Sequence, residues 1–267
     1  MPATQTITTV TQTRTQASLA TLIKNAFTAA GFPVPVVDTT VGTDRVIVYQ
    51  IVSDATKTYG TAFLRIRITT TLTILQTLSA GFNTATNVPV SPGGESNSLA
   101  TVTNLSIEVR TYVKANEFRF VILSQGSSYG FYGYLRPEER HPCFNENVAP
   151  YIFQSANVFT AGNYFVSWQC TALSPYVSGG SPVIIFFTHM TFVSLAIANP
   201  VTNQRDSVAG MILYASSGQG VAAKTSNEII MIAASGLTKF DSIQVTPGVE
   251  EYILLFPGAG SMALRTV

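Results

Sequence analysis

Residues 106–137 read SIEVRTYVKANEFRFVILSQGSSYGFYGYLRP. Apolar and polar side chains alternate on both sides of the short polar segment 114–117, and a period of two residues is typical of a β-hairpin. A third run of strand-forming residues, 131–135, follows a glycine-containing turn. The stretch therefore predicts an antiparallel sheet, and it offers no convincing catalytic side chains.

The composition is that of a globular chain with few charges. Of 267 residues, 46% are hydrophobic but only 11% are charged, and the net charge is +1. Soluble domains carry about 25% charged residues, and a surface with few charges resists association weakly. The composition therefore favours burial in an assembly. The Lys and Arg residues are scattered, so we expect no binding to nucleic acid, which needs clustered positive charge.

The location of the protein can also be predicted from its sequence. No uncharged apolar run reaches the roughly 18 residues of a membrane span, so we expect no contact with a membrane. The first residues, MPATQTITTVTQTRTQ, lack the basic start and apolar centre of a signal peptide, and we expect synthesis in the cytoplasm. Two cysteines, Cys143 and Cys170, do not make a disulfide framework and are expected to be reduced thiols.

One strong helix is predicted over residues 18–30, where apolar residues recur at helical spacing. Thr15 or Ser18 can cap its start, and Gly31 suits the left-handed position that closes a helix. Residues 1–16 are rich in Thr and Gln. They are predicted to be either a disordered tail or an extended N-terminal arm that adds to a sheet edge of a neighbouring subunit.

Strand patterns dominate the rest of the chain. Beyond the central stretch, the predicted strands cover residues 45–52, 61–78, 164–169, 183–197, 208–214, 228–233, 251–256 and 263–267. Residues 72–78 could instead form a short helix. Residues 81–98, which include Pro89, Pro92, Gly93 and Gly94, are predicted to be a surface loop.

The fold class that follows is α+β and mostly β. We predict an antiparallel, sandwich-like sheet with one N-terminal amphipathic helix packed on it. Residues 17–267 are predicted to form a single β-rich domain, with a candidate sub-boundary near residues 137–150.

Two glycine motifs match sites of known chemistry but lack the context that the chemistry needs. Residues 126–130 match G-x-S-x-G, yet no helix follows Ser128 and no His follows Asp206 or Asp241. Residues 258–263 match a dinucleotide fingerprint, but too few residues follow for the helix that binds the phosphate. The first motif is predicted to be a hairpin turn, and the second a turn into a last strand.

A charged segment raises the question of a metal site. Glu138, Glu139 and His141 could ligate a metal ion, but a site needs three or four converging ligands. The neighbouring Arg136 and Arg140 are better partners for the carboxylates and would repel a cation. We therefore expect no catalytic residue, no cofactor and no metal.

A candidate interface combines the arm with an aromatic band beyond the glycine turn. The band either packs across strands within one sheet or anchors a subunit contact, because aromatic and Arg side chains dominate interface hot spots. The candidate interface residues are Thr6, Ile7, Val10, Arg14, Tyr129, Phe131, Tyr132, Tyr134 and Arg136.

Two stretches resemble structural proteins of tailed-bacteriophage virions. They are VEEYILLFPGAGSMALRTV at residues 249–267 and FRFVILSQGSSYGFYGYLRPEERHP at residues 118–142. The Thr- and Ser-rich composition is also similar to that of phage tail, neck and baseplate components, those of cyanobacterial phages included. The resemblance implies a non-enzymatic virion building block, made in the host cytoplasm. It would assemble with copies of itself into a homo-oligomeric ring and with other virion proteins.

Three other functions stay open at this point. A carbohydrate- or receptor-binding β-sandwich module would stack sugars on Tyr132, Tyr134 or Trp168. A capsid decoration protein would have a similar composition. A hydrolase would use Ser128 as its nucleophile.

Overall fold

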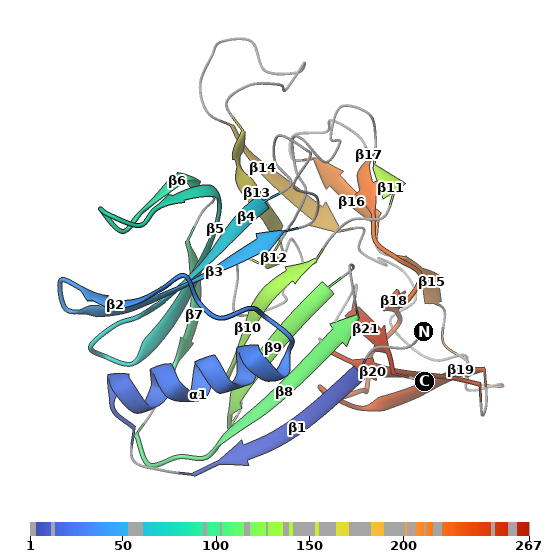
Figure 1. The fold of residues 1–267 in the computed structure, drawn as a ribbon. Helices are drawn as coiled ribbons and strands as arrows, with labels where there is room; N and C mark the ends of the chain where they lie inside the picture. The colour runs from blue at the N-terminus through green and yellow to red at the C-terminus, as the bar shows by residue number, and fades with distance from the viewer. Residues whose placement is uncertain are drawn as a thin grey trace.

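A computed structural model shows a mostly β protein in which several antiparallel sheets accompany one helix, within the described residues (Figure 1). The predicted fold class is confirmed. The structure describes residues 4–11, 14–52, 61–92, 95–101, 103–114, 118–126, 128–135, 139–140, 153–154, 164–170, 183–189, 201, 205, 207–210, 212–215, 221–246, 249–255 and 261–266.

The first sheet contains the predicted hairpin. Its strands, in spatial order, are β1 (Thr4–Val10), β8 (Ile107–Lys114), β9 (Phe118–Gln125) and β10 (Ser128–Leu135). All neighbours are antiparallel and keep one register along each pair. Gly126 turns β9 into β10 with φ 56°, and Ser128 pairs with Gln125. The G-x-S-x-G segment is therefore a hairpin turn, as predicted from the absence of a following helix.

The second sheet comes from residues 37–100. Its strands are β2 (Val37–Val41), β3 (Asp44–Val52), β4 (Thr61–Ile68), β5 (Thr73–Asn83) and β6 (Val88–Pro92), in that order, while β7 (Ser96–Ala100) also pairs with β5.

Two predictions for the second sheet are wrong. The single strand over residues 61–78 is two strands, because the chain turns at Thr69–Leu72 and Leu72 takes φ 60°. That turn contains neither glycine nor proline, so the sequence did not mark it. The surface loop over 81–98 holds the end of β5 and the strands β6 and β7, because an edge strand tolerates the prolines of β6.

The predicted helix is confirmed as α1 (Gln16–Ala29). Thr15 is its N-cap: the Thr15 hydroxyl accepts from the Ser18 N–H, and the Ser18 hydroxyl accepts from the Thr15 N–H. At the other end Gly31 takes φ 71°, and two backbone bonds, Gly31 N–H to Thr28 O and Phe32 N–H to Phe27 O, satisfy the last carbonyls.

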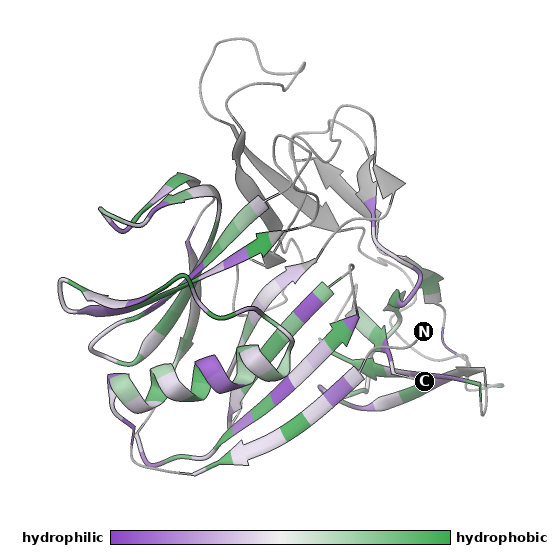
Figure 2. Ribbon diagram, in the orientation of Figure 1, coloured by the Kyte–Doolittle hydropathy of each residue, from purple (hydrophilic) through white to green (hydrophobic). Residues whose placement is uncertain are grey.

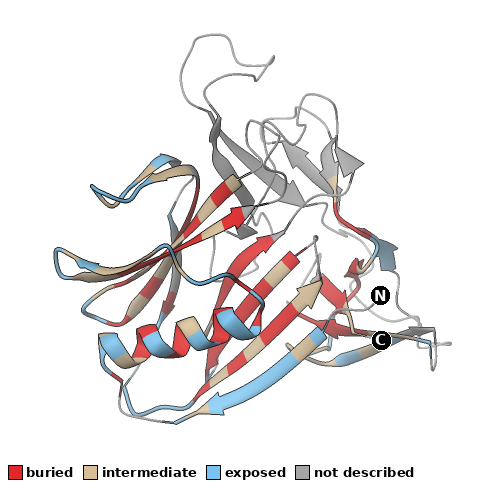
Figure 3. Ribbon diagram, viewed as in Figure 1, coloured by how far each residue is buried: buried red, intermediate tan, exposed pale blue. Residues whose placement is uncertain are grey.

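The helix and the first two sheets enclose one hydrophobic core. Leu19, Ile23 and Phe27 line the buried stripe of α1, and they pack with the inward faces of β3, β4, β8 and β10. Figure 2 shows the apolar and polar residues alternating along the strands, and Figure 3 shows the buried stripe on the helix. This alternation is what a sheet with one face on a core requires.

Two further sheets come from the second half of the chain. The third has the order β11 (Glu139–Arg140), β17 (Val221–Lys224), β16 (Ile212–Ala215), β14 (Val183–His189), β13 (Tyr164–Cys170) and β12 (Phe153–Gln154). The fourth has the order β15 (Ser207–Ala209), β18 (Ile229–Ile232), β21 (Ser261–Arg265), β20 (Glu250–Leu254) and β19 (Ser242–Thr246).

The fourth sheet has a small hydrophobic cluster of its own, which includes Ile230, Ile232 and Leu254. The last strand predicted after the glycine-rich fingerprint is present as β21, while residues 256–260 of that segment lie outside the described residues. The candidate sub-boundary near 137–150 also lies mostly outside them.

Candidate functional site

The candidate functional site is the outer edge of β1, an edge strand of the first sheet. The stretch expected to be an arm on a neighbouring subunit pairs instead with β8 of its own chain, over seven residues. No strand in the described part of the chain pairs with its other edge. Thr6, Ile7 and Thr8 are exposed, and half of the Ile7 surface is open to solvent. Figure 3 shows most of β1 coloured as exposed.

Other described sheet edges carry features that discourage pairing with a second molecule. Strand β6 contains Pro89 and Pro92, and β19 has an irregular register between Gln244 and Thr246. Strands β11, β12 and β15 have only two or three residues. Short strands, prolines, bulges and charges are the usual protections of an edge. Strand β1, TQTITTV, has no charge, no proline and no register shift.

The edge strand β2 is protected by charge. The Asp38 carboxylate accepts from Lys24 Nζ at 2.7 Å and pairs with the Arg45 guanidinium at 2.5 Å. Burial alone would raise the pKa of Asp38, but the hydrogen bonds and charges of Lys24 and Arg45 together hold it below its ordinary value. The carboxylate is therefore ionised at neutral pH and keeps this edge charged.

The outer edge of β10 is closed from within the chain. The Gln76 side chain, on β5, is 1% exposed. Its amide donates to Phe131 O at 2.8 Å, and its carbonyl accepts from Gly133 N–H at 3.2 Å. Gly133 has φ 121°, and a Cβ there would lie 2.0 Å from Arg119 O, so only glycine fits. Within the described residues, the first sheet thus has one edge, β10, to which a buried side chain binds, and one, β1, that stays open.

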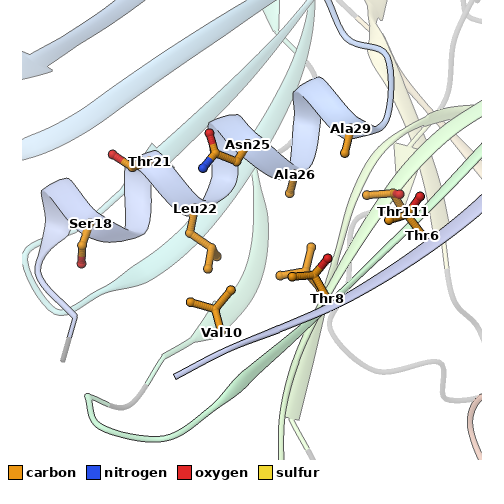
Figure 4. Close-up of a pocket in the computed structure, with 11 residues that line it drawn as sticks. Thr6, Thr8, Val10, Ser18, Thr21, Leu22, Asn25, Ala26, Ala29 and Thr111 are labelled. Carbon is orange, nitrogen blue, oxygen red and sulfur yellow. The ribbon is translucent and has the colours of Figure 1, made fainter. Parts of the chain in front are cut away.

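A groove runs along β1 on the face that α1 covers. Its volume is about 450 Å³, and its walls come from α1, β1 and β8 (Figure 4). Thr6, Thr8 and Val10 on β1 lie across it from Leu22 and Ala26 on α1. None of the side chains that line the groove is charged. The edge and the groove form one neutral surface, called here the β1 surface.

The base of β1 is held by Arg14, which sequence reasoning placed at the interface. The Arg14 guanidinium is 3% exposed and donates to the backbone oxygens of Val10 and Leu105. Burial lowers the pKa of Arg14 from its high ordinary value. Arg14 therefore ties the end of β1 to the loop before β8, and it does not present its charge at the surface.

The aromatic band is used inside the chain. Phe131 packs on Phe120 with ring centroids 4.7 Å apart, and Tyr134 meets Phe32 edge-on at 5.6 Å. The hydroxyl of Tyr132 accepts from Leu99 N–H at 3.3 Å. Phe131, Tyr132 and Tyr134 are all buried. Phe131 thus packs across strands within the first sheet, whereas Tyr132 contacts β7 of the second sheet and Tyr134 contacts Phe32 after α1. All three rings are closed to a sugar.

The structure gives less information on the other aromatic and charged candidate residues. Tyr129 is partly buried, and Arg136 lies outside the described residues. Trp168 lies in β13, and the description does not extend to its side chain. The structure brings Thr6 and Val10 together at the groove, with Ile7 on the same strand.

Sequence reasoning missed a cation–aromatic cluster between the first and fourth sheets. The Arg110 guanidinium lies 3.7 Å from the centre of the Phe240 ring, and Lys239 Nζ lies 4.2 Å from that of Tyr129. Lys239 also donates to Ser124 Oγ, and burial lowers its pKa. The contacts join residues more than 100 positions apart, so no local sequence pattern marks them.

Phe240 is the strained member of that cluster, with φ 72°. A bulky residue in this left-handed region costs about 1 kcal/mol or more relative to glycine. Phe240→Ala removes the ring but keeps the strain, whereas Phe240→Gly removes both. We expect Phe240→Ala to lower the free energy of unfolding by about 1–3 kcal/mol, and Phe240→Gly by about 1 kcal/mol less. Urea denaturation measures both, and a glycine variant less stable than the alanine variant would contradict the assigned strain.

Comparison of the sequence with models of known protein families finds no match, and comparison with curated proteins finds none either. Within the described residues, no helix is long and apolar enough to cross a membrane. No group of three His, Cys, Asp or Glu side chains placed to hold a metal ion occurs in the described ranges. The resemblance to virion proteins and the expected absence of cofactors stay predictions.

Proposed function

We propose that this chain is a non-enzymatic architectural subunit of a tailed-phage virion, in its tail, neck or baseplate, and that it assembles with its neighbours through the β1 surface. The observation that carries the proposal is the open edge of β1, which has none of the protections found at the other described edges. An exposed, regular and uncharged edge is a template for pairing with another chain.

The composition supports the same proposal. Only 11% of the residues are charged, and the β1 surface contains no charged side chain in its strand or groove. Two neutral surfaces meet without the desolvation of charges that opposes many contacts. The virion assignment rests on the resemblance of residues 118–142 and 249–267 to phage structural proteins.

A single lysine tests the role of the edge. Ile7→Lys places a charge in the middle of β1, and because Ile7 is already 50% exposed, the fold should tolerate it. We expect self-association, measured by light scattering across a range of concentrations, to weaken at least tenfold, or by about 1.4 kcal/mol. Gln244→Lys is the matched control, since it puts the same charge on the exposed face of the bulged edge strand β19. We expect this control to assemble like the parent protein.

Images of the same samples test the kind of assembly. Negatively stained particles with closed rotational symmetry would support a subunit of a virion ring. A parent protein that is monomeric at every concentration would contradict self-assembly. If Ile7→Lys and Gln244→Lys weakened self-association equally, self-assembly would still stand as the function, but β1 would not be the site of the contact.

A further inference from the structure

We propose that the partner of β1 is the β1 strand of a second copy, paired antiparallel about a two-fold axis that passes beside Ile7. The inference rests on the proposed function and specifies its first contact. A two-fold contact joins two copies, so a larger ring needs a second contact elsewhere on the subunit. A two-fold contact uses the same patch on both copies, so the patch must be complementary to itself. The sequence and exposure of β1 meet this condition in three ways.

First, the strand is centred on its large apolar residue. Strand β1 runs from Thr4 to Val10, so Ile7 is its middle residue. An axis at Ile7 brings each residue of the strand opposite one of the partner and leaves none unpaired. Ile7, half exposed in the single chain, would then face the partner's Ile7 and be covered by it.

Second, the flanking residues match under the same axis. Thr6 falls opposite the partner's Thr8, and Gln5 falls opposite the partner's Thr9. Thr–Thr pairs are favourable across antiparallel strands, since their hydroxyls bond and their β-branched side chains pack. Third, no charge lies on the strand, so the axis brings no like charges together. A shift of the axis by one residue would shorten the overlap and move Ile7 away from its symmetry mate.

The geometry of the sheet determines what else the pairing brings together. A two-fold axis between antiparallel neighbours stands perpendicular to the sheet, so both copies present the same face to the same side. Four strands from each copy would form one continuous sheet of eight. The two α1 helices would lie on one face of it, and the two grooves would become neighbours across the joined β1 strands.

Cysteine cross-linking tests the axis directly. In a background with Cys143→Ser and Cys170→Ser, which removes both native thiols, three single variants are made: Ile7→Cys, Gln5→Cys and Thr9→Cys. Each is oxidised gently and treated in parallel with a short bismaleimide, alone and in mixtures, and covalent dimers are counted on denaturing gels. Light scattering of each sample before cross-linking records whether the copies associate.

The two-fold axis predicts which variants form covalent dimers and which do not. Ile7→Cys should link to itself, and Gln5→Cys and Thr9→Cys should link when mixed but at least tenfold less when alone. Association without the Ile7 link, or with Thr9→Cys linking to itself, would overturn the two-fold axis while leaving the proposed function in place. Such a result would indicate that β1 pairs with a different segment of the second copy or that the copies associate elsewhere. A background protein that does not associate at all would overturn both proposals.

Discussion

Replacing Phe27 with alanine is expected to lower the free energy of unfolding by about 3–5 kcal/mol, the range seen for a buried aromatic side chain. Phe27 is fully buried on α1. Its ring stacks on Tyr49 of β3 at 4.7 Å and meets Phe32 at 4.5 Å. Loss of the ring leaves a cavity at the point where the helix meets the core, and urea denaturation followed by circular dichroism measures the loss.

Two variants on the same helix separate the cavity from other effects. Phe27→Leu keeps an apolar side chain and is expected to lose roughly half as much, because part of the volume stays filled. Thr28→Ala changes the exposed neighbouring residue and is expected to stay within about 0.5 kcal/mol of the parent protein. If Phe27→Ala lowered the free energy of unfolding by less than Phe27→Leu does, the assignment of Phe27 to a stacked aromatic core at α1 would be wrong.

The second large effect is expected from Gln76, the buried amide that closes the edge of β10. Gln76→Leu has a similar size but leaves the Phe131 carbonyl without the amide's N–H and the Gly133 N–H without its acceptor. A buried polar group that loses its partner costs about 1–3 kcal/mol, so the free energy of unfolding should fall by about 2–5 kcal/mol. Gln244→Leu, on an exposed face, is the control and should change it little.

Gln76→Glu adds a dependence on pH with a defined sign. A carboxylate can accept from Gly133 N–H but cannot donate to the Phe131 oxygen, whereas the protonated acid can do both. Burial raises the pKa of such a carboxyl in the folded state above its unfolded value. The variant should therefore be most stable below the ordinary pKa of glutamate and lose stability as the pH rises through the folded pKa. A loss that is the same at pH 4 and pH 8 would contradict this role.

Local sequence patterns correctly predicted the elements that depend on interactions between residues close together in the chain. The helix at residues 16–29 followed from its apolar spacing, its Thr15 cap and Gly31, all of which lie within a few residues of one another. The hairpin of β8, β9 and β10 followed from period-two alternation and from the Gly126 turn. The turn at residues 69–72 escaped prediction because β-branched residues fill it, and a left-handed leucine has no sequence signal.

Only part of the candidate site could be predicted from the sequence. The aromatic band was recognised, but whether its rings faced the core or a neighbour depended on which strands lay beside it. Gln76 and the pair of Arg110 with Phe240 were missed, because their partners lie 55 and 130 residues away in the sequence. Such contacts depend on the packing of separate sheets.

The sequence by itself determined that the protein is mostly β and where its one strong helix lies, and it left residues 1–16 as either a disordered tail or an extended arm. Only the tertiary structure decided that those residues become an edge strand of the chain's own first sheet and that Gln76 closes the opposite edge. The reason is physical. Strand and helix propensity act between neighbours in the chain, whereas an edge is open or closed according to which distant segment comes to lie beside it.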